Sequence, residues 1–154
     1  MKDLFPGPDL SEKMAHMKQA ADELGLPMGE REKTYNSRLA QELGKWAESQ
    51  GRGEEFHSAV FRAYFVDGKN IGLVNELINL VKSLDLPAEE ARQVLETRSL
   101  REAVDQEWSY CREIGVTSVP TFVMNQQGVV GAQPYEVLEE LMKIDNIRKR
   151  GPSQ

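Results

Sequence analysis

The spacing of apolar residues changes once along this chain, and that change constrains the fold more than any other feature of the sequence. Before about residue 114, apolar side chains recur at helical spacing; Phe56, Val60 and Tyr64, for example, lie at i, i+4 and i+8. After Gly115 the helical spacing stops and short β-like runs begin. We therefore expect a mainly α-helical protein with a small β element near its C-terminus.

Start and stop signals divide the helical part into six segments. Asn36 is a suitable N-cap, and Ser99 with Glu102 forms a capping box. The helix at 54–65 is the most apolar, and Phe61 and Phe65 widen its apolar face, so we expect it to be central. Together these signals predict helices over residues 9–24, 37–50, 54–65 and 71–84, from Pro87 onward, and over 99–114.

The β-like part of the sequence is short. Residues 121–125 and 128–132 are β-like runs separated by Gln126 and Gln127, and glycines bound the second run. This pattern predicts a β-hairpin. Pro134 then opens an amphipathic helix that we expect to run to about residue 145. The predicted fold class is therefore mainly α with a C-terminal β-hairpin.

The composition excludes several classes of protein. A length of 154 residues with 40% hydrophobic and 29% charged residues suits one globular domain, or one domain with a sizeable insertion. The net charge of −6 disfavours nucleic acid and anionic membranes as partners. No apolar run approaches the roughly 20 residues of a membrane span. The first residues lack the apolar core of a signal peptide, so we expect a cytoplasmic protein.

Few side chains are suited to redox or metal chemistry. The single cysteine, Cys111, forms neither an intrachain disulfide nor a thiolate metal cluster, and two histidines, His16 and His57, are too few for most zinc sites. We therefore expect no metal and no cofactor. Cys111 continues the apolar helical stripe of Val104 and Trp108, so we interpret it as a buried structural thiol. We interpret both histidines as structural or solvated.

The segment Thr117–Phe122 places Pro120 at the first position of the predicted strand. A proline cannot donate a ladder hydrogen bond, so the start of a strand is a position that tolerates it. The bond before a proline is also the only peptide bond whose cis form lies just about 0.5–1 kcal/mol above trans. Taken alone, these residues fit either a trans proline or a cis bond that opens the backbone of Val119 to another strand.

The wider sequence resembles the DsbA-like thioredoxin-fold family, and within it the cytoplasmic branch often called FrnE-like. The C-terminal residues that carry the resemblance are G-V-T-S-V-P-T-F-V, then G-V-V-G-A-Q-P, then the last amphipathic helix. Upstream segments resemble the helical insertion of that branch; these are residues 25–27, 36–40, 56–65 and 67–72. The resemblance covers approximately residues 4–145, which is nearly the whole chain.

The resemblance implies a function and a site. The family's function is that of a thiol–disulfide oxidoreductase or isomerase, acting on protein thiols and disulfides. Pro120 corresponds to the family's cis-proline and Val119 to its substrate-facing neighbour. We therefore expect the loop of Ser118, Val119, Pro120 and Thr121 to bind substrate, because such a loop presents backbone groups to an extended chain.

The resemblance also implies a domain organisation with one departure from the family. We expect residues 1–115 to form the helical domain, 116–146 the C-terminal part of an incomplete thioredoxin fold, and 147–154 a disordered tail. The family's first βαβ segment, with its Cys-x-x-Cys, has no counterpart in this sequence. Thiol–disulfide exchange by that motif needs an attacking and a resolving cysteine. We therefore expect a truncated, redox-inactive member, and we assign no catalytic residue.

Two other functions stay open at this point. Kappa-class glutathione transferases and 2-hydroxychromene-2-carboxylate isomerases share the split fold and bind glutathione at the cis-proline loop, but they use a serine in the segment that has no counterpart here. A lone serine in upstream sequence would indicate such an enzyme, whereas Cys-x-x-Cys would indicate a redox enzyme. The other possibility is a non-enzymatic helical module that binds peptides or partner chains.

The predicted hairpin also bears on assembly. Without the βαβ segment, the hairpin has an unpaired edge and the last helix has an uncovered apolar face. An unpaired strand edge favours pairing with another chain. We therefore expect a homodimer in which the hairpins or the C-terminal helices pack across a two-fold axis.

Overall fold

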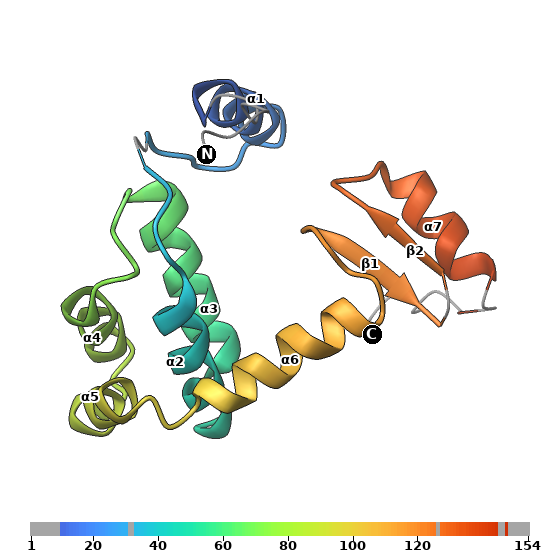
Figure 1. Ribbon diagram of the computed structural model, residues 1–154. Helices are drawn as coiled ribbons and strands as arrows, with labels where there is room; N and C mark the ends of the chain where they lie inside the picture. Colours follow the sequence, from blue (N-terminus) through green and yellow to red (C-terminus); the bar gives the residue numbers. More distant parts are fainter. Residues whose placement is uncertain (1–9, 31–32, 126, 145–146, 148–154) are drawn as a thin grey trace, which may run out of the picture. The chain divides into compact units, whose positions relative to one another are not determined.

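The computed structural model of the chain describes residues 10–30, 33–125, 127–144 and 147, and it is mainly helical with one small sheet (Figure 1). This confirms the predicted fold class. The elements are α1 (Leu10–Glu23), α2 (Arg38–Ser49), α3 (Gly53–Phe61), a π-helical turn η1 (Arg62–Val66), α4 (Val74–Ser83), α5 (Ala88–Thr97), α6 (Arg101–Glu113), β1 (Thr121–Met124), β2 (Gln127–Val130) and α7 (Tyr135–Ile144).

The chain divides into two compact units, and the boundary between them along the sequence falls within α6. The N-terminal unit is Met1–Asp105 and the C-terminal unit is Gln106–Gln154. The domain boundary expected from the sequence follows that helix, after residue 115. Of the tail expected at 147–154, only Ile147 belongs to the described residues. Within the ranges that the structure describes, no helix has the length and apolar character needed to cross a membrane.

The core of the N-terminal unit lies between α2, α3, α4 and α5. α2 packs against α3 and α5, and α4 packs against the same two helices. On α2, Leu43, Trp46 and Ala47 are buried at i, i+3 and i+4, the spacing that places side chains on one helical face. The other helices contribute buried stripes of the same kind, which include Phe56, Val60, Leu77, Ile78, Val81, Ala91 and Leu95.

The helix predicted at residues 54–65 is only partly buried in the core. Phe56 and Val60 are buried, as the spacing predicts. The expectation that Phe61 widens the buried face is wrong, because Phe61 is 62% exposed and its ring instead contacts Phe65. Phe61 lies five residues after Phe56, which at 100° per residue turns it well away from the buried stripe. From Arg62 the backbone then widens from α to π geometry.

The C-terminal unit contains the predicted hairpin. β1 and β2 pair antiparallel, with Thr121 opposite Val130 and Met124 opposite Gln127. The hairpin is confirmed, but its second strand begins at Gln127 rather than after it. Asn125 takes a φ of 52°, the left-handed conformation that asparagine tolerates in hairpin turns. α7 packs against both strands.

Candidate functional site

The segment between α6 and β1 carries the proline loop, which we define as Ser118–Thr121. The Val119–Pro120 peptide bond is cis, the isomer that the family resemblance implies. The hydroxyl of Thr121 donates a hydrogen bond to the carbonyl of Ser118 at 2.6 Å. The carbonyl of Pro120 accepts one from the N–H of Gly131 at 2.8 Å. These two bonds fix the loop to itself and to the far end of the hairpin.

The proline loop is open to solvent. Among the residues that the structure describes, Val119 is the most exposed of the large apolar ones, at 89%. Ser118 and Pro120 are also exposed, and Thr121 is half-buried. The structure thus places all four residues predicted from the sequence together at the start of β1, where a binding partner can reach them.

A hollow of about 410 Å³ lies beside the proline loop, and we call it the hairpin hollow. Thr121 belongs to both the loop and the hollow. The hollow is lined by Tyr110, Ile114, Gly115, Val116, Thr121, Val123, Asn125, Gln127, Gly128 and Val130. None of these lining residues is charged, whereas charged residues make up 29% of the whole chain. The hollow therefore suits an apolar or neutral group rather than an ion.

Cys111 lies on α6 close in sequence to this site, but it does not line the hairpin hollow. The expectation of a buried thiol is wrong, because Cys111 is only half-buried. On the same stripe of α6, Val104 is buried whereas Trp108 is 43% exposed. The apolar stripe of this helix is therefore covered near its start and open to solvent farther along.

The two histidines stand apart from the proline loop in sequence. His16 is exposed on α1. The Nε2 atom of His57 lies 3.9 Å from a carboxylate oxygen of Glu48, and both side chains are largely open to solvent. In the part of the chain that the structure describes, no three His, Cys, Asp or Glu side chains lie close enough together to hold a metal ion.

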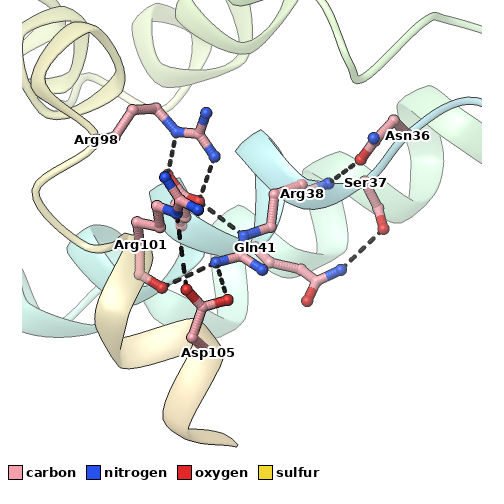
Figure 2. Close-up of polar contacts among 8 residues, drawn as sticks. Asn36, Ser37, Arg38, Gln41, Arg98, Arg101 and Asp105 are labelled. Atoms are coloured by element: carbon pink, nitrogen blue, oxygen red, sulfur yellow. Dashed lines mark hydrogen bonds and ion pairs between the residues drawn. The ribbon is translucent and has the colours of Figure 1, made fainter. Parts of the chain in front are cut away.

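A polar cluster that the sequence does not predict lies in the N-terminal unit (Figure 2). Glu42 of α2 is fully buried. Arg98 donates two hydrogen bonds to its carboxylate, from Nε and Nη2, both at 2.7 Å, and Arg38 donates a third at 2.8 Å. Arg38 also donates to Asp105 at 2.6 Å and to the main-chain carbonyl of Arg101 at 2.9 Å. The cluster therefore ties α2 to the α5–α6 connection and to the first turns of α6.

Electrostatics in this cluster favours the charged form of Glu42. The hydrogen bonds from Arg98 lower the pKa of Glu42, burial raises it, and Arg38 lowers it again, so that the pKa lies below its usual value. The pKa values of both arginines are raised, chiefly by their hydrogen bonds to Glu42. Two arginines hold this carboxylate in its ionised form, which makes it a poor acceptor for a substrate proton. The contacts of the cluster instead join α2 to the start of α6.

A signal for this cluster was present in the sequence. Glu42 follows Leu39 by three residues and precedes Trp46 by four, so it lies on the apolar stripe of its helix. A carboxylate on a buried stripe requires a partner. The partner, Arg98, lies 56 residues away in the chain, and no local pattern connects the two.

The sequence of this chain matches that of a known protein family. A family model described as DSBA-like thioredoxin domain matches residues 6–143. The uncharacterized protein YwbO of Bacillus subtilis (strain 168) is 29% identical over 112 residues, which cover 72% of this chain and 56% of YwbO. This chain thus spans little more than half the length of that relative.

Two solved structures resemble this chain. A probable DsbA oxidoreductase from Streptomyces coelicolor has a TM-score of 0.79 and 26% identity, over 93% of this chain and 63% of that protein. A 2-hydroxychromene-2-carboxylate isomerase has a TM-score of 0.75 at 21% identity, over 92% of this chain and 71% of that one, which is a likeness of fold. The family match extends over nearly all the described elements, from the helical unit to the hairpin and α7. By that match, the chain belongs to the family of DSBA-like thioredoxin domains.

Proposed function

We propose that this chain is the substrate-binding part of a thiol–disulfide oxidoreductase or isomerase of the DsbA type. The proline loop binds an extended segment of a protein thiol or disulfide. The observation that carries the proposal is the exposure of Val119, at 89%, at the start of a strand and beside an uncharged hollow. The 26% identity to a probable DsbA oxidoreductase supports the redox class of substrate.

The proposed recognition is by backbone and shape. An extended chain that lies along the proline loop pairs with main-chain groups, which every sequence offers. The neighbouring hairpin hollow has room for an apolar side chain and has no charged residue in its lining. Such a site accepts many different unfolded segments, since it selects for extended conformation and apolar character rather than for a charge pattern.

We also infer that these 154 residues do not by themselves catalyse thiol–disulfide exchange. Exchange by the family's motif requires one cysteine to attack and a second to resolve the mixed disulfide. The sequence contains only Cys111. That thiol is half-buried and does not line the hairpin hollow.

Binding to the proline loop is tested with a fluorescently labelled, unfolded model protein whose cysteines are alkylated, so that binding is separated from redox chemistry. Val119→Asp places a charge in the loop and removes an apolar contact, and we expect the dissociation constant to rise by roughly tenfold or more. Ile144→Asp is the matched control, since Ile144 is also an exposed apolar residue of the C-terminal unit, at the end of α7. Equal effects of the two substitutions would refute a binding site at the loop.

The redox inference is tested separately by the reduction of insulin with dithiothreitol. We expect the 154-residue chain and its Cys111→Ser variant to give the rate of the buffer alone. Catalysis that disappears in Cys111→Ser would overturn the inference of inactivity while leaving the binding proposal intact.

A second candidate function is that of a glutathione-dependent enzyme related to the 2-hydroxychromene-2-carboxylate isomerases, which is favoured by the fold likeness to one of them. Calorimetric titration with reduced glutathione distinguishes the two. Glutathione binding that Val119→Asp weakens, without binding of the unfolded protein, would favour the glutathione-dependent enzyme. Peptide binding that is unaffected by Val119→Asp would instead favour a helical binding module.

A further inference from the structure

A small hollow of about 220 Å³ lies beside the buried carboxylate of Glu42, and we call it the Arg98 hollow. It is lined by Asn36, Arg38, Leu39, Gly72 and Arg98, all of which belong to the N-terminal unit. Hydrogen bonds within that unit hold the lining in place. The main-chain N–H of Arg38 donates to Oδ1 of Asn36 at 2.8 Å, and that of Gly72 donates to Oδ1 of Asn70 at 3.0 Å. The helical unit therefore forms this hollow from its own residues.

The guanidinium of Arg98 has donors that its contact with Glu42 does not use. Nε and Nη2 each donate to the carboxylate at 2.7 Å. The third nitrogen, Nη1, points away from these two bonds (Figure 2) and has no hydrogen-bond partner in the part of the chain that the structure describes. A guanidinium carries five N–H groups, and its free edge can hold a second oxyanion through parallel bonds. Because Glu42 fixes the guanidinium, that edge is already in position for a ligand.

Asn36 supplies a second kind of donor to the same hollow. Its Oδ1 accepts the N–H of Arg38, and this bond identifies the other amide atom, Nδ2, as a remaining donor. Nδ2 has no partner among the described residues. Asn36 also directly precedes the N-terminal end of α2, where the helix dipole adds positive potential. The hollow thus combines a guanidinium, an amide donor and a favourable dipole.

The charge around the hollow is positive in a chain that is negative as a whole. The ion pairs of the neighbouring cluster join three arginines, Arg38, Arg98 and Arg101, to two carboxylates, those of Glu42 and Asp105. The cluster therefore has an excess of one positive charge, and no acidic residue lines the hollow. The net charge of the chain is −6, which disfavours the binding of anions over most of its surface.

We propose that the Arg98 hollow binds one small oxyanion, a carboxylate or a phosphate group, through Nη1 of Arg98 and Nδ2 of Asn36. Its volume of about 220 Å³ is smaller than the roughly 300–1,000 Å³ of pockets that hold drug-sized ligands, so it accommodates one such group rather than a large molecule. The bound oxyanion balances the excess positive charge of the cluster. The proposal does not depend on the proposed redox substrate, because no residue of the proline loop lines this hollow.

The test is a nuclear magnetic resonance titration of the full 154-residue chain, isotopically labelled with nitrogen, at neutral pH and constant ionic strength. One arm uses inorganic phosphate and the other uses acetate. We expect saturable shifts of the Nε–H signal of Arg98, of the side-chain amide of Asn36 and of the main-chain amides of residues 36–39. Saturation by phosphate alone, by acetate alone or by both supports the proposal and identifies the group that the hollow binds.

Two matched substitutions assign the binding to the hollow. Asn36→Asp keeps the oxygen that accepts the N–H of Arg38, so the start of α2 is preserved, but it replaces the amide donor by a negative charge. Asn75→Asp makes the same change at an exposed residue of α4 that does not line the hollow. We expect the dissociation constant of the anion to rise about tenfold or more in Asn36→Asp and to stay within about a factor of two in Asn75→Asp.

Two results would overturn the proposal. One is the absence of saturable shifts at Arg98 and Asn36 with either salt. The other is an equal weakening of binding by Asn36→Asp and Asn75→Asp, since net charge rather than the donors of the hollow would then govern binding. Circular dichroism shows whether both variants keep their helical content. If Asn36→Asp loses it, the shifts of the unsubstituted chain decide the outcome alone.

Discussion

At the scale of single residues, the most consequential side chain in the N-terminal unit is Glu42. Its carboxylate is fully buried and holds two arginines at 2.7–2.8 Å. Glu42→Gln removes the charge but keeps the shape, and leaves Arg38 and Arg98 without their shared anion. Breaking a buried ion pair in this way costs about 3–5 kcal/mol, and we expect the free energy of unfolding to fall by about 3 kcal/mol. Urea denaturation measures the change.

The control for this prediction is Glu48→Gln on the same helix. Glu48 is exposed and pairs with Lys45 at 2.9 Å. Exposed pairs contribute little, so the free energy of unfolding should change by no more than about 0.5 kcal/mol. Similar losses for both variants would mean that the burial of Glu42 is not what makes its ion pairs important.

Glu42 also predicts a pH dependence of stability. Its pKa is lower in the folded chain than in the unfolded chain, chiefly through the hydrogen bonds from Arg98. The stability that it contributes is therefore fully present above the unfolded-state pKa of a glutamate, about 4.3, and is lost as the pH falls through the lower folded-state pKa. We expect the stability difference between the unsubstituted chain and Glu42→Gln to shrink as the pH is lowered from neutral into the acid range. A difference that is constant or grows on acidification would contradict the assigned direction of the shift.

Contacts between single residues are also the feature of this fold that its sequence predicts least completely. The residues of the proline loop are predicted because the segment around Pro120 resembles the cis-proline hairpin of a known family, whereas proline at the start of a strand does not by itself indicate a binding loop. Glu42 and Arg98 form no such pattern, since their contact depends on how α2 and the α5–α6 connection pack. The exposure of Phe61 and the half-burial of Cys111 were missed for a related reason. Apolar spacing shows which residues share a stripe, but not how far along the stripe a neighbouring element extends.

At the scale of elements, two helices end at residues of the same unusual conformation. Asp85, which follows α4, and Arg98, which follows α5, both have a φ of 54°. A residue other than glycine pays about 1–2 kcal/mol to adopt this left-handed conformation. Glycine avoids that strain, but its greater freedom in the unfolded chain costs about 0.5–1 kcal/mol of stability. Arg98 differs from Asp85 in that its side chain binds buried Glu42.

This difference predicts opposite effects of the same substitution. Asp85→Gly should raise the free energy of unfolding by about 0.5 kcal/mol, because it only relieves the backbone. Arg98→Gly should lower it by about 1–2 kcal/mol, because hydrogen bonds between charged groups contribute about 1.5–3 kcal/mol and outweigh the relief. Thermal and urea denaturation of the two variants measure both changes. If Arg98→Gly were also stabilising, the pairing with Glu42 would not be what holds arginine at this position.

Element positions were predicted well where the signal is local. Helix α2 was expected at 37–50 and lies at Arg38–Ser49, since its apolar stripe and flanking residues define both ends. The sequence predicts the hairpin turn one residue too late, because the polar pair Gln126 and Gln127 is more typical of a loop than Asn125 alone. The π-helical turn at Arg62–Val66 was not predicted, because its apolar residues fit an α-helix equally well.

At the scale of the whole molecule, the two compact units differ in how they are stabilised. The N-terminal unit has a continuous apolar core from α2 to α5 and a buried ion-pair cluster. The C-terminal unit has two four-residue strands, one buried side chain in α7, Leu141, and several exposed apolar residues. The unit that carries the proline loop is therefore the one with more apolar surface available to a partner.

The most direct test of a substrate-binding proline loop is a map of amide chemical shifts on titration with an extended, cysteine-containing peptide. We predict that the shifts concentrate in residues 117–124 and in the lining of the hairpin hollow, and that they disappear in Val119→Asp. Shifts confined to the helices of the N-terminal unit, or no shifts at saturating peptide, would contradict the assignment of this loop as the binding site.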